Sequence, residues 1–189
     1  MGETYSSLSD QGFLRHFTEF RETAYRLETL QAYDVSYERA EFDRFLSGEP
    51  RGRFPGIAEW ADMVKQGVQE GKRFQRVHVV IEPLSDYVRF ECAWAYRHNV
   101  AAGEDVRIIP VEKGEWPDGL PRRDYWLFDS RVLVAMHYDP DGSFRSAESV
   151  DNESEIAHAR AWRDLAVASS LAFPDYERGF DELMRERRA

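Results

Sequence analysis

The spacing of hydrophobic side chains changes along the N-terminal part of the chain. Hydrophobic residues recur every three or four positions over residues 8–21 and again over 57–70, which predicts a helix in each segment. Between them, residues 23–30 alternate in polarity, which predicts a half-buried strand. Ser36 is placed as the N-cap of another helix, which is expected to end near Leu46.

The middle of the chain has the clearest pattern. Residues 74–81 alternate as a strand, Ser85 is placed to cap a helix over 86–98, and residues 105–111 form a second apolar strand. Two strands separated by a helix of this length predict a βαβ unit, in which the strands run parallel and the crossover is right-handed.

The C-terminal part continues with short strands and ends with helices. Three strands are expected in quick succession, at residues 124–128, 132–138 and 143–150. The turn from Asp139 to Gly142 carries Pro and Gly at positions typical of a hairpin, which predicts an antiparallel meander. A helix over residues 152–170 and a short one after Pro174 complete the pattern.

Together these elements predict an α+β fold. Its mixed sheet should contain one βαβ unit and an antiparallel meander, with helices at the N-terminus and the C-terminus. The loop over residues 48–56 is rich in Gly and Pro and is the best candidate for an internal boundary. Residues 1–50 are expected to form an N-terminal helical segment that packs on an α+β main domain of residues 51–189, giving one domain together.

Charge and composition restrict the partners. The net charge of -10 opposes phosphate binding, and short basic runs, including Arg185, Arg187 and Arg188 at the C-terminus, alternate with acids. We therefore expect no direct nucleic-acid binding. The sequence also has no signal peptide and no membrane-spanning segment, so we expect a cytoplasmic protein without a membrane partner. Cys92, the single cysteine, is expected to be a buried, unreactive thiol.

The common catalytic and metal-binding motifs are not found. The loop after the strand at 74–81 contains no glycine and places Glu82 and Asp86 where phosphates would bind, so it is neither a P-loop nor a dinucleotide fingerprint. No Gly-x-Ser-x-Gly elbow is present, and His16, His98 and His158 have no partner at a recognised ligand spacing. We therefore predict no catalytic residue, no cofactor and no metal site.

Two polar stripes are candidates for a binding site. In the strand at 74–81, Arg76, His78 and Glu82 share one face, either as a ligand or acid–base site or as the wet face of an edge strand. In the following helix, Tyr87 and Glu91 fall on one face with aromatic neighbours, either lining a pocket or packing in the core with a satisfied carboxylate. In both cases we expect Glu82 and Glu91 to lie near Arg76 or Arg89.

Eight segments in a fixed order resemble domain-of-unknown-function family 6879. They include Arg-Val-His-Val-Val-Ile-Glu-Pro at 76–83 and His-Tyr-Asp-Pro-Asp-Gly at 137–142; the others are 24–30, 45–50, 86–91, 99–105, 125–129 and 161–164. The resemblance covers about residues 20 to 172. It implies a small actinobacterial protein of no established activity, whose gene often lies near a helix-turn-helix regulator. The family positions are Arg26, Glu28, Arg76, Glu82, Tyr87, Arg89, Glu91, Asn99, Asp105, Trp126 and Asp129.

Three functional interpretations remain. The favoured one is a non-enzymatic accessory domain that binds a small ligand or a protein, such as a helix-turn-helix regulator that it serves as a sensor. Its ligand-binding candidates are Arg76, Glu82, Tyr87, Arg89, Glu91, Asn99, Trp126 and Asp129. The alternative is an enzyme, a hydrolase or phosphodiesterase-like scaffold, with Arg76, Glu82, Glu91 and Asp129 in one pocket. The third is a structural module that forms a homodimer.

Overall fold

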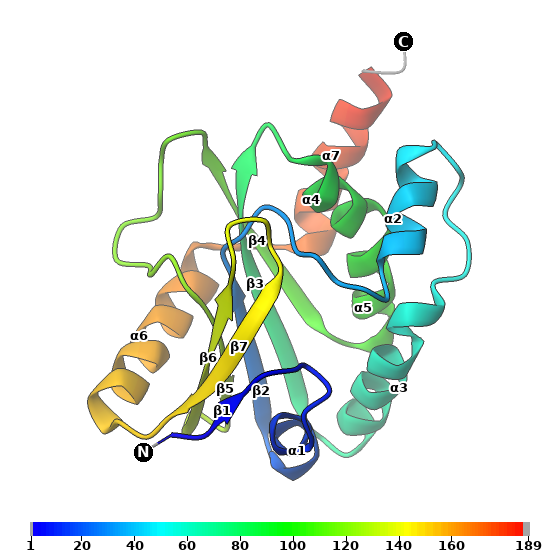
Figure 1. Cartoon of the computed structure of the whole chain (residues 1–189). Helices are drawn as coiled ribbons and strands as arrows, with labels where there is room; N and C mark the ends of the chain where they lie inside the picture. Colours follow the sequence, from blue (N-terminus) through cyan, green and yellow to red (C-terminus); the bar gives the residue numbers. More distant parts are fainter. Residues whose placement is uncertain (1, 187–189) are drawn as a thin grey trace.

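The computed structural model describes residues 2–186, with side chains through residue 179 (Figure 1). Its strands are β1 (Thr4–Tyr5), β2 (Thr23–Glu28), β3 (Arg73–Glu82), β4 (Asp105–Glu112), β5 (Asp124–Phe128), β6 (Val132–Tyr138), β7 (Phe144–Val150) and β8 (Leu171–Ala172). Its helices are α1 (Gln11–Glu19), α2 (Arg39–Leu46), α3 (Pro55–Gln69), α4 (Asp86–Phe90), the π-helical turn η1 (Glu91–Ala95), α5 (Tyr96–Ala102), α6 (Glu153–Ser169) and α7 (Phe173–Glu186). Of the basic C-terminal residues, Arg187 and Arg188 lie outside the described residues, and so does the side chain of Arg185.

One mixed sheet organises the chain, in the order β1-β7-β6-β5-β2-β3-β4-β8. Strands β2, β3 and β4 are parallel, and the βαβ unit predicted for the middle of the chain is confirmed. Strands β5, β6 and β7 form the predicted antiparallel meander, which joins the parallel part through β2 and β5. The strands at the two edges, β1 and β8, each have two residues and pair with only part of β7 and β4. The α+β prediction is therefore confirmed.

The helices cover the two faces of the sheet unequally. Among the described helices, α6 lies against one face, and α1 to α5 and α7 lie against the other (Figure 1). The α6 face is a continuous apolar core that includes Leu27, Val77, Val79, Leu127 and Ile156. The opposite face has separate apolar clusters under α1 and α3, and under α4, α5 and α7. No described helix is both long and apolar enough to cross a bilayer.

Three local predictions differ from the structure. Strand β3 lies between β2 and β4, so it is not an edge strand, and His78 on its polar face is fully buried. Helix α2 begins at Arg39 with Glu38 at its N-cap, so Ser36 does not cap it. Ser85 does cap α4, by accepting the Val88 N–H, but the expected single helix over 86–98 is interrupted by η1.

Candidate functional site

Polar side chains gather on one face of β2, β3 and β5. Because alternate strand residues point to opposite faces, Arg26 and Glu28 share the face of β2 that lies away from α6. The register places Arg76 beside Arg26 and His78 beside Glu28. These four side chains lie under α3 to α5, and together with Asp124, Glu104, Glu91 and Tyr96 we call them the buried network.

One half of the buried network is built on Asp124, which is 3% exposed at the start of β5. Its carboxylate accepts hydrogen bonds from Arg26 at 2.7 Å, from Tyr33 at 2.6 Å and from the hydroxyl of Thr29 at 2.6 Å. The Arg26 guanidinium also lies over the Trp126 ring, 5.6 Å from its centroid. Asp124 therefore fixes both the arginine and the chain that leaves β2.

The other half is centred on Arg76. Its Nη1 donates to Glu28 at 2.7 Å and its Nε donates to Glu104 at 2.8 Å. Glu104 follows Gly103, the C-cap of α5, and its backbone N–H donates to the Asn99 carbonyl. Its carboxylate also accepts from the Trp60 indole at 2.8 Å. The end of α5 thus positions a carboxylate opposite the strand arginine.

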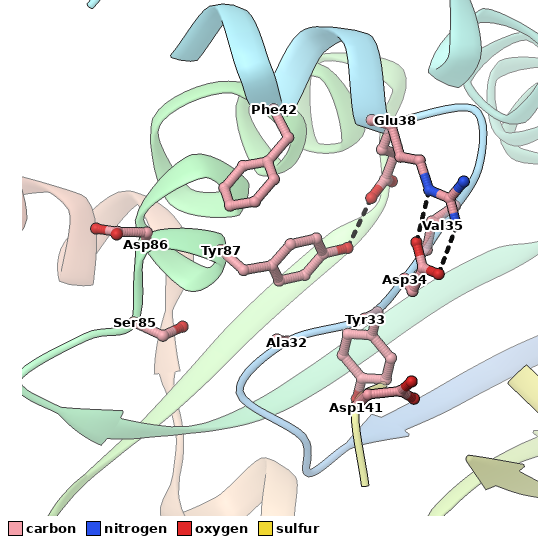
Figure 2. A pocket seen from close by; sticks show the side chains of 11 residues that line it. Ala32, Tyr33, Asp34, Val35, Glu38, Phe42, Ser85, Asp86, Tyr87 and Asp141 are labelled. Atoms are coloured by element: carbon pink, nitrogen blue, oxygen red, sulfur yellow. Dashed lines mark hydrogen bonds and ion pairs between the residues drawn. The ribbon is translucent and has the colours of Figure 1, made fainter. Parts of the chain in front are cut away.

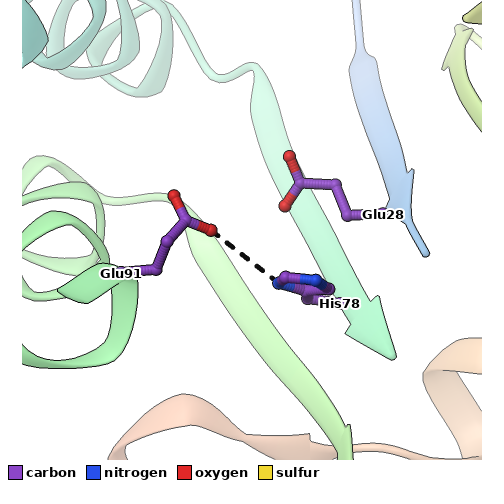
Figure 3. A group of neighbouring side chains, drawn as sticks. All are labelled: Glu28, His78 and Glu91. Atoms are coloured by element: carbon purple, nitrogen blue, oxygen red, sulfur yellow. Dashed lines mark ion pairs between the residues drawn. The ribbon is translucent and has the colours of Figure 1, made fainter. Parts of the chain in front are cut away.

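His78 connects Glu28 to the helical layer. Its Nε2 lies 2.7 Å from the Leu30 carbonyl and its Nδ1 lies 2.7 Å from the Tyr96 hydroxyl. Because a carbonyl only accepts, Nε2 carries a proton, and in the neutral ring Nδ1 accepts from Tyr96. Glu91, which begins the π-helical turn, points at the same ring with an oxygen 3.8 Å from Nδ1 (Figure 3). Such π-turns often occur at functional sites.

Burial and neighbouring charges shift the pKa values of the acids in opposite directions. Burial alone would raise the pKa of Glu28, but the guanidinium groups of Arg76 and Arg26 outweigh burial and lower it to about 2. Burial raises the pKa of Glu91 well above its usual value, and the charges of Glu28 and Glu38 add to this. Burial lowers the pKa of His78. Burial therefore favours the neutral forms of both Glu91 and His78.

A surface pocket of about 400 Å³ adjoins the buried network (Figure 2). It lies between the segment that leads into α2, the N-terminus of α4 and the β6–β7 turn. Its lining residues are Ala32, Tyr33, Asp34, Val35, Glu38, Arg39, Phe42, Ser85, Asp86, Tyr87 and Asp141. The walls combine three aromatic rings with four carboxylates and one guanidinium.

Two tyrosines line the pocket, and one of them connects it to the buried network. Tyr33 lines the pocket and donates its hydroxyl proton to Asp124 of the network. Tyr87 lines the pocket and donates to Glu38 at 2.6 Å (Figure 2). Burial raises the pKa of Glu38 to about 7, partly offset by the Tyr87 hydrogen bond and the charge of Arg76. This carboxyl therefore changes charge in the physiological pH range.

The structure places the sequence-predicted candidates in different surroundings. Arg76 and Glu91 belong to the buried network, Trp126 borders it beneath Arg26, and Tyr87 lines the pocket. Asn99 is 3% exposed on α5 and, among the described residues, its Oδ1 has no hydrogen-bond partner.

The other three candidates lie elsewhere. Glu82 accepts from Tyr176 at 2.9 Å at the end of β3, and Arg89 pairs with Asp86 at 3.0 Å. The expected pairing of Glu82 with Arg76 or Arg89 is therefore not what the structure has. The Asp129 carboxylate accepts hydrogen bonds from the backbone N–H groups of Arg21, Glu22 and Thr23. These bonds connect the β5–β6 turn to the start of β2.

Sequence reasoning did not single out several residues of the site. Glu38, Glu104 and Asp124 are each followed or preceded by other charged residues in the sequence, which is typical of exposed segments, yet all three are buried. Tyr96 was not distinguished from the other aromatic residues of its helix. Arg26 and Glu28 are named above only as family positions, and the structure gives the reason: two charges on one face of a central strand require buried partners.

Comparisons with known proteins identify a family. No curated protein matches this chain. Among solved structures, TrmBL2, an archaeal chromatin protein whose structure shows a novel mode of DNA binding, superposes with a TM-score of 0.47 and 8% identity. The match covers 91% of this chain and 53% of that one, so this chain spans about half of its length. The family described as a domain of unknown function, DUF6879, matches residues 11–178, and the chain belongs to that family.

Proposed function

We propose that this protein is a non-enzymatic sensor domain that binds a small organic cation in the pocket. The observation that carries the proposal is the composition of the pocket walls, where Tyr33, Phe42 and Tyr87 lie among carboxylates. Aromatic faces attract cations, and neighbouring carboxylates supply the counter-charge. A ligand with an ammonium or guanidinium group and a short apolar part matches both features.

The charges that line the pocket favour a cation over an anion. Asp34 and Arg39 neutralise each other through two hydrogen bonds of 2.8 and 2.6 Å. Asp86 has Arg89 as its partner, and Asp141 accepts the Ser143 N–H of its own turn. With the one lining guanidinium committed to Asp34, an anionic ligand would meet an excess of carboxylates without a free cation in the wall.

Glu38 supports the proposal because its carboxyl group can lose its proton when a cation binds. It is 7% exposed, borders the pocket, and has a pKa raised to about 7 by burial. A bound cation stabilises the ionised carboxylate, so binding must release a proton wherever Glu38 is protonated in the free protein. Affinity for the cation should therefore rise as pH increases from about 6 to 8.

The pocket walls connect a bound ligand to helices α2 and α4 and to the buried network. Glu38 is the N-cap residue of α2 and Tyr87 lies in α4, so a ligand that changes the hydrogen bond between them affects both helices. Tyr33 connects the opposite wall to Asp124 in the buried network. We propose that a protein partner with a basic surface, such as a DNA-binding regulator, recognises the resulting change on this acidic domain.

Calorimetric titration with three probes of similar shape tests the ligand class. Phenethylamine, phenethyl alcohol and phenylacetate carry a positive, a neutral and a negative group on the same ring and chain. We expect measurable binding of the amine, with affinity lowered about 3- to 30-fold by Phe42→Ala, in line with one cation–π contact. Glu38→Gln should remove the pH dependence. Glu49→Gln, at an exposed carboxylate that does not line the pocket, should leave amine binding unchanged.

Either of two results would overturn the ligand proposal. Binding of phenylacetate as tightly as phenethylamine would show that the pocket does not select positive charge. Amine binding that is unaffected by both Phe42→Ala and Glu38→Gln would place it elsewhere on the surface.

The proposed role requires the domain to act through a partner and not through DNA. With a net charge of -10, the chain would have to gather its basic residues on one face in order to neutralise phosphates. We expect no duplex binding in an anisotropy titration at about 150 mM salt. Sub-micromolar binding that weakens steeply with added salt would contradict this and make DNA the primary partner.

A further inference from the structure

Three potential metal ligands from three elements meet inside the buried network (Figure 3). Glu28 comes from β2, His78 from β3 and Glu91 from the π-helical turn η1. One ligand atom from each lies within 4.8 Å of the others, and the three residues are between 0% and 6% exposed. A group of this kind can be a hydrogen-bonded cluster or a cation site, and three further observations favour the second.

The first observation is an unpartnered carboxylate oxygen. Glu91 is 5% exposed, and its Oε2 has no hydrogen-bond partner within the described part of the chain. This oxygen is directed at the His78 ring and lies 3.8 Å from Nδ1, too far for a hydrogen bond. Buried polar atoms nearly always have a partner, so an unpartnered oxygen aimed into a cluster of ligand atoms indicates a missing ligand.

The second observation concerns charge. Within the buried network, Arg26 and Arg76 carry two positive charges against the carboxylates of Glu28, Glu104 and Asp124. The ion-paired carboxylates therefore exceed the guanidinium groups by one, and Glu91 places a fourth carboxyl group in the same desolvated interior. A divalent cation in contact with Glu91 and Glu28 neutralises this excess.

The third observation is the orientation of His78. Its Nε2 is held by the Leu30 carbonyl at 2.7 Å, which directs Nδ1 toward Glu28 and Glu91. Histidines that ligate metals typically donate their other ring N–H to a carbonyl or carboxylate in this way. Neutral imidazole with one nitrogen fixed by the backbone is the form that binds a metal.

We propose that Glu28, His78 and Glu91 bind a divalent first-row transition metal such as Zn²⁺ or Mn²⁺. The ligand set of one imidazole and two carboxylates suits these metals better than soft Cu⁺, for which thiolate or thioether ligands would be needed. On Glu28 the available oxygen is Oε2, because Oε1 accepts from Arg76. The Tyr96 hydroxyl, 2.7 Å from Nδ1 and 3.2 Å from Glu28 Oε2, is either displaced or becomes a fourth ligand.

This inference departs from the sequence-based expectation of no metal. That expectation relied on the short ligand spacings of common zinc and iron motifs. Here the ligands are at positions 28, 78 and 91, and only the parallel pairing of β2 with β3 and the crossover into η1 bring them together. The site is separate from the cation-binding pocket, since none of its three ligands lines that pocket.

Metal content and binding of the full-length protein, produced without a histidine tag, test the proposal. We expect elemental analysis to find close to one Zn²⁺ or Mn²⁺ per chain, and chelation to lower the melting temperature, with recovery after metal is added back. Co²⁺ added to the stripped protein should give visible d–d absorption. Glu91→Gln and His78→Gln should each weaken metal binding by more than about 100-fold, beyond the usual effect of losing an outer-shell partner.

Controls separate this site from adventitious binding and from failure to fold. His158→Gln, an exposed histidine on α6, should leave metal affinity unchanged, and Phe42→Ala in the pocket should do the same. If a ligand variant does not fold, the wild-type protein still decides the question. No bound metal, no effect of chelation and no Co²⁺ spectrum would overturn the proposal, as would metal binding that survives both ligand substitutions in folded protein.

Discussion

The two faces of β2 and β3 are built from neighbouring residues but stabilised by different forces. Toward α6, Leu27, Val77 and Val79 are fully buried in an apolar core. Toward α3 to α5, the intervening residues are Arg26, which is buried, and Arg76, whose side chain is 13% exposed, and both pair with carboxylates. Apolar contacts are non-directional and tolerate repacking, whereas a buried charge network requires each group to have its partner. The α6 face therefore provides general stability, and the network face provides a site with fixed geometry.

The largest loss of unfolding free energy should follow the removal of one charged side chain from the network face. Arg76→Met leaves Glu104 without its ion-pair partner and Glu28 with Arg26 alone, at 3.5 Å, and we expect a loss of about 3–5 kcal/mol in unfolding free energy at pH 7. Leu127→Ala on the α6 face creates a cavity and should cost about 2–5 kcal/mol. Urea denaturation of both variants measures these losses.

The pH dependence of these losses distinguishes the faces better than their size. In the wild type, the folded-state pKa of Glu28 lies below its unfolded value, so its stabilisation is present above about pH 4.5 and is lost toward pH 2. Without Arg76 that lowering is reduced, and burial makes the ionised form costly. The Arg76→Met loss should therefore shrink between pH 7 and 5, while the Leu127→Ala loss stays constant. Parallel pH profiles for the two variants would contradict the comparison.

A glycine next to the pocket should give the next largest effect. Gly142 has a φ of +87°, and a Cβ there would lie 2.5 Å from the Ala32 backbone oxygen at the pocket wall. Gly142→Ala should cost about 1–3 kcal/mol in unfolding free energy and weaken amine binding, because both strain and a backbone clash result. Gly48→Ala is the matched control, with a φ of +76° and no atom within 4 Å. Equal losses for both would show that the close approach to Ala32 is unimportant.

Ionisation of Glu38 should affect the stability of the fold in the opposite direction from ionisation of Glu28. Its folded-state pKa is raised to about 7, so its ionisation destabilises the fold as pH rises from about 4.5 through 7. Glu38→Gln keeps an acceptor for Tyr87 but removes this charge, and should increase unfolding free energy by about 1–3 kcal/mol at pH 8 and by little at pH 5. Thermal unfolding at both pH values checks this, and a variant that is less stable at pH 8 would contradict it.

The sequence predicted the parts of the fold that depend on local pattern. The β3–α4–β4 unit follows from strand alternation and the Ser85 cap, and the β5–β6–β7 meander from short strands and turn residues. The network could not be predicted in the same way, because its pairs are distant in the chain. Arg26 and Asp124, for example, are 98 positions apart and meet only after β2 pairs with β5.

The π-helical turn was missed for a related reason. The spacing of Tyr87, Glu91 and Trp94 fits a continuous α-helix, and the extra residue in the turn changes which of them share a face. In the structure Tyr87 lines the pocket, Glu91 enters the buried network and Trp94 packs with Phe90 in the core. The residue types indicated a polar and aromatic helix, but its tertiary partners determine where each side chain points.

The native reactivity of Cys92 reports whether the network face opens by itself. The thiol is fully buried in η1 beside Glu91, and burial raises its pKa. Native protein at pH 8 should react with a thiol reagent more than about 100-fold more slowly than unfolded protein, because labelling requires opening of the α4–η1–α5 segment. If the network holds that segment, Arg76→Met should accelerate labelling more than Leu127→Ala does when denaturant brings the two variants to equal global stability. Equal labelling rates under those conditions would mean that the two faces unfold as one unit, and that their difference in chemistry has no counterpart in local stability.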